Sequence, residues 1–219
     1  MNEIVIFGTK NFAEIAQYYF THDSNLTVAG FTVDGDYLEE ESYLGLPVVP
    51  FEDLAKHFPP ERYGIFVALG LNRVNQSRAD KVAAAEAKGY RLAGFLSSKA
   101  HVADDFVLRP NTMVMEHAIL HPRVTVGCDT IIWSTARIAW HSQIGNHCWV
   151  TSPCTGERVS VGDNTFLGIN CTIAPGVSIG RRNIIGTGAL IMSDTKDDEV
   201  YRGPVSRAAR AASHQLKTF

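Results

Sequence analysis

Large aliphatic residues recur at every sixth position through most of the second half of the chain. The series runs from Val102 to Val150, shifts by one residue across the segment 153–156, and resumes from Val161 to Ile191. Its members are Val102, Leu108, Val114, Leu120, Val126, Ile132, Ile138, Ile144 and Val150, then Val161, Leu167, Ile173, Ile179, Ile185 and Ile191. Chance does not produce a run of this length, so it is an internal repeat, and a repeat takes precedence over local propensity.

A period of six excludes the usual amphipathic elements, because a helix needs a period near 3.6 and a half-buried strand a period of 2. It is typical of a triangular solenoid, in which three short strands make a coil of about 18 residues and the aliphatic side chains stack inside. The positions two before the aliphatic residues are mostly small, and Cys148 and Cys171 occupy two of them. We therefore expect these two thiols to be interior and structural.

The first half of the chain follows a different rule, since short apolar runs alternate with segments of helical spacing. We expect strands at 3–8, 26–34 and 65–70, helices at 12–20 and 74–88, and a segment at 92–96 that leads out of this part of the chain. Alternating strands and helices predict a parallel sheet with crossover connections. The predicted fold is therefore a small Rossmann-like parallel α/β domain followed by an all-β parallel β-helix.

The distribution of charge supports this division of the 219 residues. Residues 1–99 hold 22 of the 43 charged side chains, residues 100–195 hold 13, and residues 196–219 hold 8. We expect these three ranges to be an α/β domain, a β-helix domain and a C-terminal tail. The formal net charge of −3 argues against a binder of nucleic acid, which needs a strong basic excess.

Other features of composition point to the cytoplasm. No apolar run approaches the roughly 20 residues of a membrane span, and the first residues lack the basic and apolar regions of a secretory signal. The four cysteines have neither CxxC nor Cys/His zinc spacing, so we expect reduced thiols and no metal site.

The loop after the first predicted strand is a candidate nucleotide site. It occupies the place of a GxGxxG turn but keeps only its first glycine, Gly8, so we exclude NAD. A loop at a helix N-terminus, with Asp34 closing the next strand, can still hold a diphosphate and a ribose. A plain structural turn is the alternative.

Together these motifs resemble the hexapeptide-repeat nucleotide-sugar acetyltransferases, the group of sialic-acid O-acetyltransferases and of bacillosamine and perosamine N-acetyltransferases. The resemblance is carried by the hexapeptides and by Ile6–Thr9, Phe31–Asp34, Leu44–Pro50, Ser97–Ala100 and Phe166–Asn170. It implies a left-handed β-helix, acetyl-CoA as cosubstrate, a nucleotide-linked amino sugar as acceptor, and a homotrimer active in bacterial surface-glycan synthesis. It also implies that Gly8, Thr9 and Asp34 bind the sugar nucleotide.

The resemblance further implies a histidine base on a turn of the β-helix, four residues before an Ile-Gly pair. Ile144 and Gly145 set that register, which places Trp140 at the position of the base and His141 directly after it. Histidine suits this role because its pKa lies near the operating pH. We take His141 as the candidate base. A structural or substrate-binding histidine and a surface histidine are the alternatives.

For CoA, the resemblance points to backbone and turn residues of the later coils and to one arginine of the tail. The candidates are Gly156, Gly168, Ile169, Gly186, Thr187, Gly188 and Arg207. The tight turns of a solenoid would explain the glycines equally well.

Three functional hypotheses remain open from the sequence. An N-acetyltransferase is favoured because a partly neutral amine needs less help from a base than a hydroxyl, and proximity alone lowers the barrier. The alternatives are a non-catalytic trimer that binds a sugar nucleotide and an O-acetyltransferase. The tryptophans Trp133, Trp140 and Trp149 all lie in the β-helix, where we expect them to be exposed and to support a trimer interface.

Overall fold

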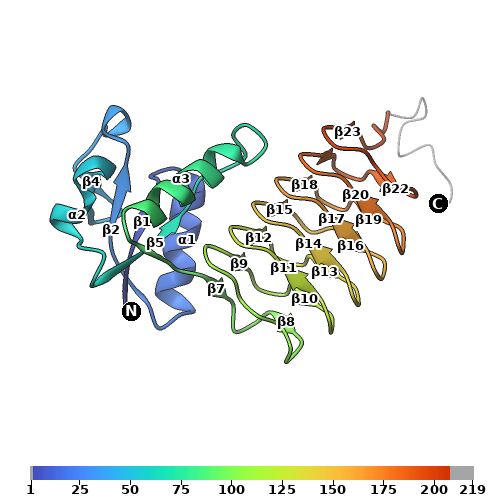
Figure 1. The fold of residues 1–219 in the computed structure, drawn as a ribbon, viewed down its shortest axis with the longest axis horizontal. Coiled ribbons are helices and arrows are strands. Elements are labelled where there is room, and N and C mark those ends of the chain that lie inside the picture. The colour runs from blue at the N-terminus through green and yellow to red at the C-terminus, as the bar shows by residue number, and fades with distance from the viewer. Residues whose placement is uncertain (1, 208–219) are drawn as a thin grey trace, which may run out of the picture.

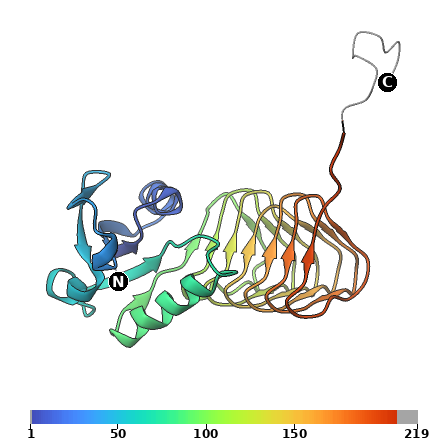
Figure 2. The same ribbon diagram turned by 90° about the horizontal axis from the view of Figure 1, so that it is seen from above.

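The computed structural model describes residues 2–207, which form two parts (Figures 1 and 2). The first is a sheet with helices, and the second is a regular stack of parallel coils that runs away from it. In residues 2–207, no helix has both the length and the apolar character needed to cross a bilayer.

The first part is built on a six-stranded sheet in the order β3-β4-β2-β1-β5-β6. All neighbours pair in parallel except β3 and β4, which form an antiparallel hairpin. The strands are β1 (Glu3–Phe7), β2 (Thr27–Val33), β3 (Ser42–Tyr43), β4 (Leu46–Pro50), β5 (Tyr63–Val67) and β6 (Arg91–Leu92), and the helices are α1 (Asn11–His22), α2 (Leu54–His57) and α3 (Gln76–Ala87).

Both faces of this sheet are buried, which explains the continuous apolar runs of its strands. On β1, Ile4 and Ile6 pack in one cluster with Phe20 of α1, whereas Val5 and Phe7 pack in another with Val82 of α3. The three predicted strands and both predicted helices are confirmed by β1, β2, β5, α1 and α3. The β3–β4 hairpin and α2 were not predicted, because short elements leave no periodic signal.

The second part is a solenoid of two-residue strands. Its sheets are the β10 face (β8, β10, β13, β16, β19, β22), the β11 face (β11, β14, β17, β20) and the β12 face (β7, β9, β12, β15, β18, β21, β23). The strands are β7 (Phe95–Leu96), β8 (His101–Val102), β9 (Met113–Val114), β10 (Ile119–Leu120), β11 (Thr125–Val126), β12 (Ile131–Ile132), β13 (Arg137–Ile138), β14 (Gln143–Ile144), β15 (Trp149–Val150), β16 (Cys154–Thr155), β17 (Ser160–Val161), β18 (Phe166–Leu167), β19 (Thr172–Ile173), β20 (Ser178–Ile179), β21 (Ile184–Ile185), β22 (Leu190–Ile191) and β23 (Val200–Tyr201).

The six-residue series forms the core of the solenoid. Its members from Val114 to Ile191 are buried, and Val102 and Leu108, in the first coil, are half-buried. Cys148 and Cys171 lie in this core with no exposed surface, and burial raises the pKa of each thiol to about 12. The structural interpretation of both cysteines is confirmed.

Thr155 absorbs the one-residue shift in the series. It takes the interior position on β16 and is 2% exposed, and its Oγ1 accepts the Ala139 N–H at 3.0 Å. The register pairs Arg137 with Cys154, seventeen residues later, whereas β16 pairs with β19 at the usual eighteen, as for Cys154 and Thr172. The deleted residue therefore shortens one corner and leaves the ladder intact.

Three of the eight histidines of the chain occupy corners with left-handed backbone. His117, His141 and His147 have φ values of 59°, 59° and 56°, and asparagine or aspartate takes the same conformation at other corners, such as Asn111 and Asp129. These residue types tolerate positive φ better than most. Part of the histidine content therefore serves the turns.

A buried polar cluster joins the two parts of the molecule. Arg78 of α3 and Asp129 of the solenoid have no exposed surface, and Arg78 Nε donates to Asp129 Oδ1 at 2.8 Å. Asn111 Nδ2 donates to the same oxygen at 2.6 Å, and Asn111 also bonds both backbone groups of Val67 on β5. His147 Nδ1 lies 2.8 Å from Asp129 Oδ2. We call this set the seam cluster.

The tryptophans behave differently from the expectation. Trp149 is 6% exposed and packs against Phe12 of α1 with ring centroids 4.8 Å apart, and Trp133 lies 6.2 Å from the same ring. The first domain of the same chain therefore covers both residues, and their expected exposure was wrong. Trp140 alone of the three is largely exposed, at 43%.

Candidate functional site

The three residues predicted to bind the sugar nucleotide line one pocket. Gly8, Thr9 and Asp34 surround a cavity of about 390 Å³ at the carboxyl ends of β1 and β2. Ligands of open parallel sheets usually bind at this edge. Gly8 has a φ of 120°, and a Cβ there would lie 3.0 Å from the Ala68 carbonyl oxygen, so only glycine fits this position.

The loop before α1 and the first residues of α1 carry free backbone amides. The amides of residues 9–12 have no acceptor among residues 2–207, and Lys10 before the helix makes no side-chain cap. The first amides of a helix together with its dipole favour an anion. The loop therefore offers several donors to a phosphate, although it lacks two glycines of the dinucleotide motif.

Lys81 of α3 is a site residue that sequence reasoning missed. Its Nζ lies 2.5 Å from Asp34 Oδ1, and it stands over the rings of Phe7 and Phe51 at 4.8 and 4.7 Å. Both Asp34 and Lys81 line the cavity. The sequence carries no signal for this pair, because it depends on how α3 crosses the sheet.

A second hollow, of about 570 Å³, continues from the same loop toward the solenoid. It shares Gly8, Thr9 and Lys10 with the first cavity and reaches Trp133 and Trp149. The buried Nε1 of Trp133 has no acceptor among residues 2–207. The loop thus lies between a polar pocket and an aromatic one.

The third candidate region is a groove of about 560 Å³ along the β10 face and its following corners, which we call the β10-face groove. Its lining residues are His121, Arg137, Ala139, Trp140, Cys154, Thr155, Gly156, Glu157, Thr172, Ile173, Ala174, Pro175, Leu190 and Met192. Exposed apolar side chains flank it, since Leu190 is 63% and Met192 67% exposed. Such a surface suits the apolar part of a ligand or a second protein chain.

The structure separates two histidines that lie near Trp140. His141 is exposed at its corner, with its ring 6.4 Å from that of Trp140, and it does not line the groove. His121 belongs to the preceding coil, is half-buried, and does line the groove, with its ring 6.1 Å from that of Trp140. The position of Ile144 and Gly145 in the sequence could not predict this difference between the histidines. It identifies the corner on which His141 lies, but not the direction of its side chain.

Gly156, predicted to contact CoA, lines the groove, but its amide is already hydrogen-bonded within the ladder. It donates to the Ile173 carbonyl oxygen at 2.8 Å in the ladder between coils. The amides of Trp140 and Glu157, at equivalent places of successive corners, have no acceptor among residues 2–207. They are the free donors of this part of the groove.

The remaining predicted CoA residues, except Arg207, lie at the corners between the β12 face and the β10 face. Gly168 and Gly186 lie on successive coils, and Ile169 and Thr187 follow them on the exposed surface. A Cβ on Gly168 would lie 2.7 Å from the Thr187 nitrogen, and Gly188 has a φ of 69°. The tight stacking of coils is therefore sufficient to explain these glycines.

Arg207 is exposed in the segment after β23 and has no ion-pair partner in residues 2–207. No contact places it at either site. Arg182 is paired with Asp198, with Nε 2.5 Å from Oδ1.

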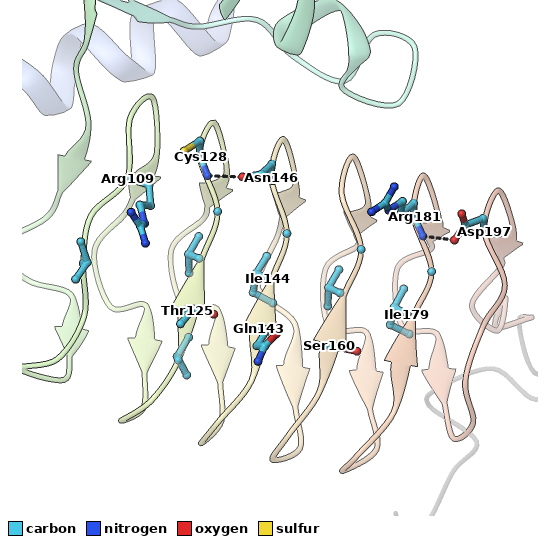
Figure 3. A pocket seen from close by; sticks show the side chains of 18 of the residues that line it. Arg109, Thr125, Cys128, Gln143, Ile144, Asn146, Ser160, Ile179, Arg181 and Asp197 are labelled. Atoms are coloured by element: carbon cyan, nitrogen blue, oxygen red, sulfur yellow. Dashed lines mark hydrogen bonds between the residues drawn. The ribbon is translucent and has the colours of Figure 1, made fainter.

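The β11 face carries another hollow, of about 640 Å³, without any predicted site residue (Figure 3). Its polar side chains bond to neighbouring corners: Asn146 Oδ1 accepts the Cys128 amide at 2.9 Å, and Asp197 Oδ1 accepts the Arg181 amide at 2.8 Å. Gln143 and Ser160 point outward between them. The hydrogen bonds of Asn146 and Asp197 stabilise the ladder, and no histidine lines this hollow.

Comparison with known proteins identifies the repeat. Residues 158–192 match the bacterial transferase hexapeptide family (six repeats). Among the similar solved structures, two examples each match 93% of this chain. The acetyltransferase domain of PglB from Neisseria gonorrhoeae FA1090 is 18% identical, with 97% of that chain covered and a TM-score of 0.81. A mutant of GDP-perosamine N-acetyltransferase from Caulobacter crescentus, in complex with CoA and GDP-perosamine, is 25% identical, with 94% covered and a TM-score of 0.69.

A curated relative matches over a shorter stretch. YvoF of Bacillus subtilis (strain 168), provisionally named an acetyltransferase, is 29% identical over 116 residues, which are 53% of this chain and 62% of that protein. The chain therefore spans less than two thirds of this relative. The predicted resemblance to hexapeptide-repeat sugar acetyltransferases is confirmed, and the parallel sheets with the hexapeptide match fit a left-handed β-helix.

Proposed function

We propose that the chain transfers the acetyl group of acetyl-CoA to the amino group of a nucleotide-linked sugar, as a step of bacterial surface-glycan synthesis. One observation carries the proposal: a nucleotide-sized pocket on the parallel sheet and an apolar groove on a hexapeptide solenoid occur in one chain. The similarity to a perosamine N-acetyltransferase that holds CoA and GDP-perosamine supports it over nearly the whole length.

In this proposal the sugar nucleotide binds at the edge of the sheet. The free amides of residues 9–12 and the N-terminus of α1 hold the diphosphate. Asp34, fixed by Lys81, accepts hydrogen bonds from ribose hydroxyls, and the ammonium of Lys81 adds positive charge for the phosphates. The sugar then extends from the loop away from the sheet.

Acetyl-CoA binds along the β10-face groove and the adjoining corners. The small side chains of Ala139 and Ala174 and the bare backbone of Gly156 leave room for the pantetheine arm. Ile169 and Thr187 lie exposed at the corner on the other edge of the same face. Arg207 is proposed for the phosphates of CoA on charge alone.

The reaction needs an amine placed at the thioester carbonyl, stabilisation of the oxyanion, and removal of a proton. The free amides of Trp140 and Glu157 are donors for the oxyanion. A histidine beside Trp140 takes the proton, and both His121 and His141 lie there. The amino group is the favoured acceptor, because a hydroxyl depends more strongly on the base.

A homotrimer belongs to the same proposal. The β10 face and its corners expose Ile119, Trp140, Leu190 and Met192, at 38%, 43%, 63% and 67%. A neighbouring copy would cover this apolar surface and close the groove. Sedimentation as a monomer at micromolar concentration would contradict the assembly.

Thiol release from acetyl-CoA in the presence of a panel of nucleotide-linked amino sugars tests the function, with mass spectrometry of the acceptor. We expect an acetylated amine from at least one amino sugar and none from the matching hydroxyl sugars. Acetylation of a hydroxyl instead would identify an O-acetyltransferase. No release, together with retained nucleotide binding, would favour a non-catalytic binding protein.

A further inference from the structure

We propose that His121, and not His141, is the proton acceptor of the acetyl transfer. This inference rests on the proposed function and assigns the histidine within the groove. Four observations carry it: the shape of the β10-face groove, the position of His121 at its end, the free imidazole, and the absence of His141 from the groove lining.

The groove follows one position through successive coils. The strand registers place His121, Ala139, Gly156, Ala174 and Met192 at equivalent positions, directly after β10, β13, β16, β19 and β22. Two large side chains therefore enclose three small residues. With about 4.8 Å between neighbouring strands, the distance from the first coil to the last is roughly 19 Å. An extended ligand, such as the pantetheine arm of acetyl-CoA, that lies along these small residues would end at His121 or at Met192.

Only the end at His121 carries chemistry for acyl transfer. Its imidazole is half-buried and makes no hydrogen bond to any group in residues 2–207. Met192, at the other end, has no proton-accepting group. The free amides of Trp140 and Glu157 lie on the two coils that follow His121. A thioester placed at this end meets a base and oxyanion donors together.

Trp140 accounts for the difference between the histidines. Its ring lies 6.1 Å from that of His121 and 6.4 Å from that of His141, and the groove is lined by Trp140 and His121. His141 sits at the left-handed corner position, where its coil equivalents are Arg123 and Arg158, both exposed. The indole therefore stands beside the groove, and the His141 imidazole faces solvent.

The neutral amine attacks the thioester carbonyl, a C–N bond forms, and His121 takes the proton from the amine nitrogen. The C–S bond then breaks, and the imidazolium returns the proton to the leaving sulfur. The products are the acetamido sugar and free CoA, with His121 neutral again.

Several charged or titratable groups surround His121. Arg137 of β13 and Glu157 of the corner after β16 line the same groove, as does the Cys154 thiol, which accepts a hydrogen bond from Arg137 Nη1 at 3.4 Å. On its own corner, Arg123 is paired with Asp105, with Nε 3.7 Å from Oδ2. His141, whose ring lies 6.4 Å from that of Trp140, does not line the groove.

The test compares His121→Ala, His121→Gln and His141→Ala in the full-length protein, with His117→Ala as a matched control. His117 has the same left-handed corner geometry and an exposed side chain at another corner. Turnover is measured as thiol release against pH, and acetyl-CoA affinity is measured separately by calorimetry. We expect both His121 variants to lose about 100-fold or more in kcat, with acetyl-CoA affinity changed by less than about threefold, and to lose the acidic limb of the kcat/KM profile.

The His141 variant should lose less than about fivefold and keep the acidic limb. A His121→Gln protein within about fivefold of wild type, or the large loss in His141→Ala instead, would overturn the assignment. A wild-type protein that binds acetyl-CoA but acetylates no acceptor would overturn the proposed function, and the role of His121 with it. Active wild type with active His121 variants would overturn only the role of His121.

Discussion

Replacing Arg78 by methionine tests whether the seam cluster fixes the two parts of the molecule to each other. Arg78 and Asp129 are both fully buried. The guanidinium donates to Asp129 Oδ1 at 2.8 Å, to the Asp129 carbonyl oxygen at 3.0 Å and to the Cys148 carbonyl oxygen at 3.3 Å. It also stands 5.4 Å from the ring of Trp149. Methionine fills much of the volume but leaves the carboxylate without its counter-charge.

Breaking a buried ion pair from one side costs about 3–5 kcal/mol, because a charge remains desolvated. Asn111 and His147 still contact the Asp129 carboxylate, so we expect a value near the lower end. For a chain of this size, about 3 kcal/mol corresponds to a fall in Tm of roughly 6–12 °C. Differential scanning calorimetry at neutral pH measures it directly.

Two further variants sharpen the result. Arg73→Met removes an exposed pair with Asp80 near the start of the same helix and should change Tm little, since such pairs contribute about 0–1 kcal/mol. Adding Asp129→Asn to Arg78→Met removes both charges and should recover part of the loss. A Tm of Arg78→Met within about 2 °C of wild type would refute the reasoning.

Three smaller predictions concern the solenoid. Thr155→Val leaves the buried Ala139 amide without an acceptor and should lower the free energy of unfolding by about 1–3 kcal/mol, as measured by urea denaturation. Thr155→Ser keeps the hydroxyl and should lower it less. Equal losses in the two variants would exclude the hydrogen bond as the cause. Cys148 and Cys171, whose pKa values are raised to about 12 by burial, should resist alkylation at about pH 8 until the protein unfolds, as peptide mapping would reveal. Burial alone would raise the pKa of Glu116, but hydrogen bonds from Tyr19 and Ser134 outweigh it and leave the pKa lowered. The Glu116 carboxylate therefore contributes its full stability above its pKa in the unfolded chain, and this stability is lost as the pH falls through its lower pKa in the folded protein. Glu116→Gln should then flatten the decline in Tm between about pH 6 and pH 3. An unchanged decline would contradict this.

The solenoid could be predicted because its core is one-dimensional. Each aliphatic residue from Val114 to Ile191 contacts its own counterparts on adjacent coils, so the sequence period records the packing directly. Even the interruption was visible, and Thr155 explains it through a hydrogen bond that replaces an aliphatic contact. The parallel sheet was also predictable, since both faces of β1 are buried and its apolar run is continuous.

Features that depend on packing between distant segments could not be predicted. Lys81 reaches Asp34 only because α3 crosses the sheet at that place, and Trp133 and Trp149 are covered only because α1 lies over the β12 face. The distinction between His121 and His141 is of the same kind. His141 directly follows Trp140, and His121 directly precedes Pro122, which is equivalent to Trp140 one coil earlier. Only His121 lines the groove.

The most direct test of the central claim, that the β10-face groove binds acyl-CoA, uses two native cysteines. Cys154 lines this groove and Cys128 lines the hollow on the β11 face, and both are half-exposed. Iodoacetamide labelling is followed at each thiol by peptide mass spectrometry, with and without saturating desulfo-CoA, which carries no thiol of its own. The account predicts that desulfo-CoA slows modification of Cys154 by about tenfold or more and leaves Cys128 unchanged. Equal rates at Cys154 with and without the ligand, under conditions where calorimetry detects binding, would contradict it.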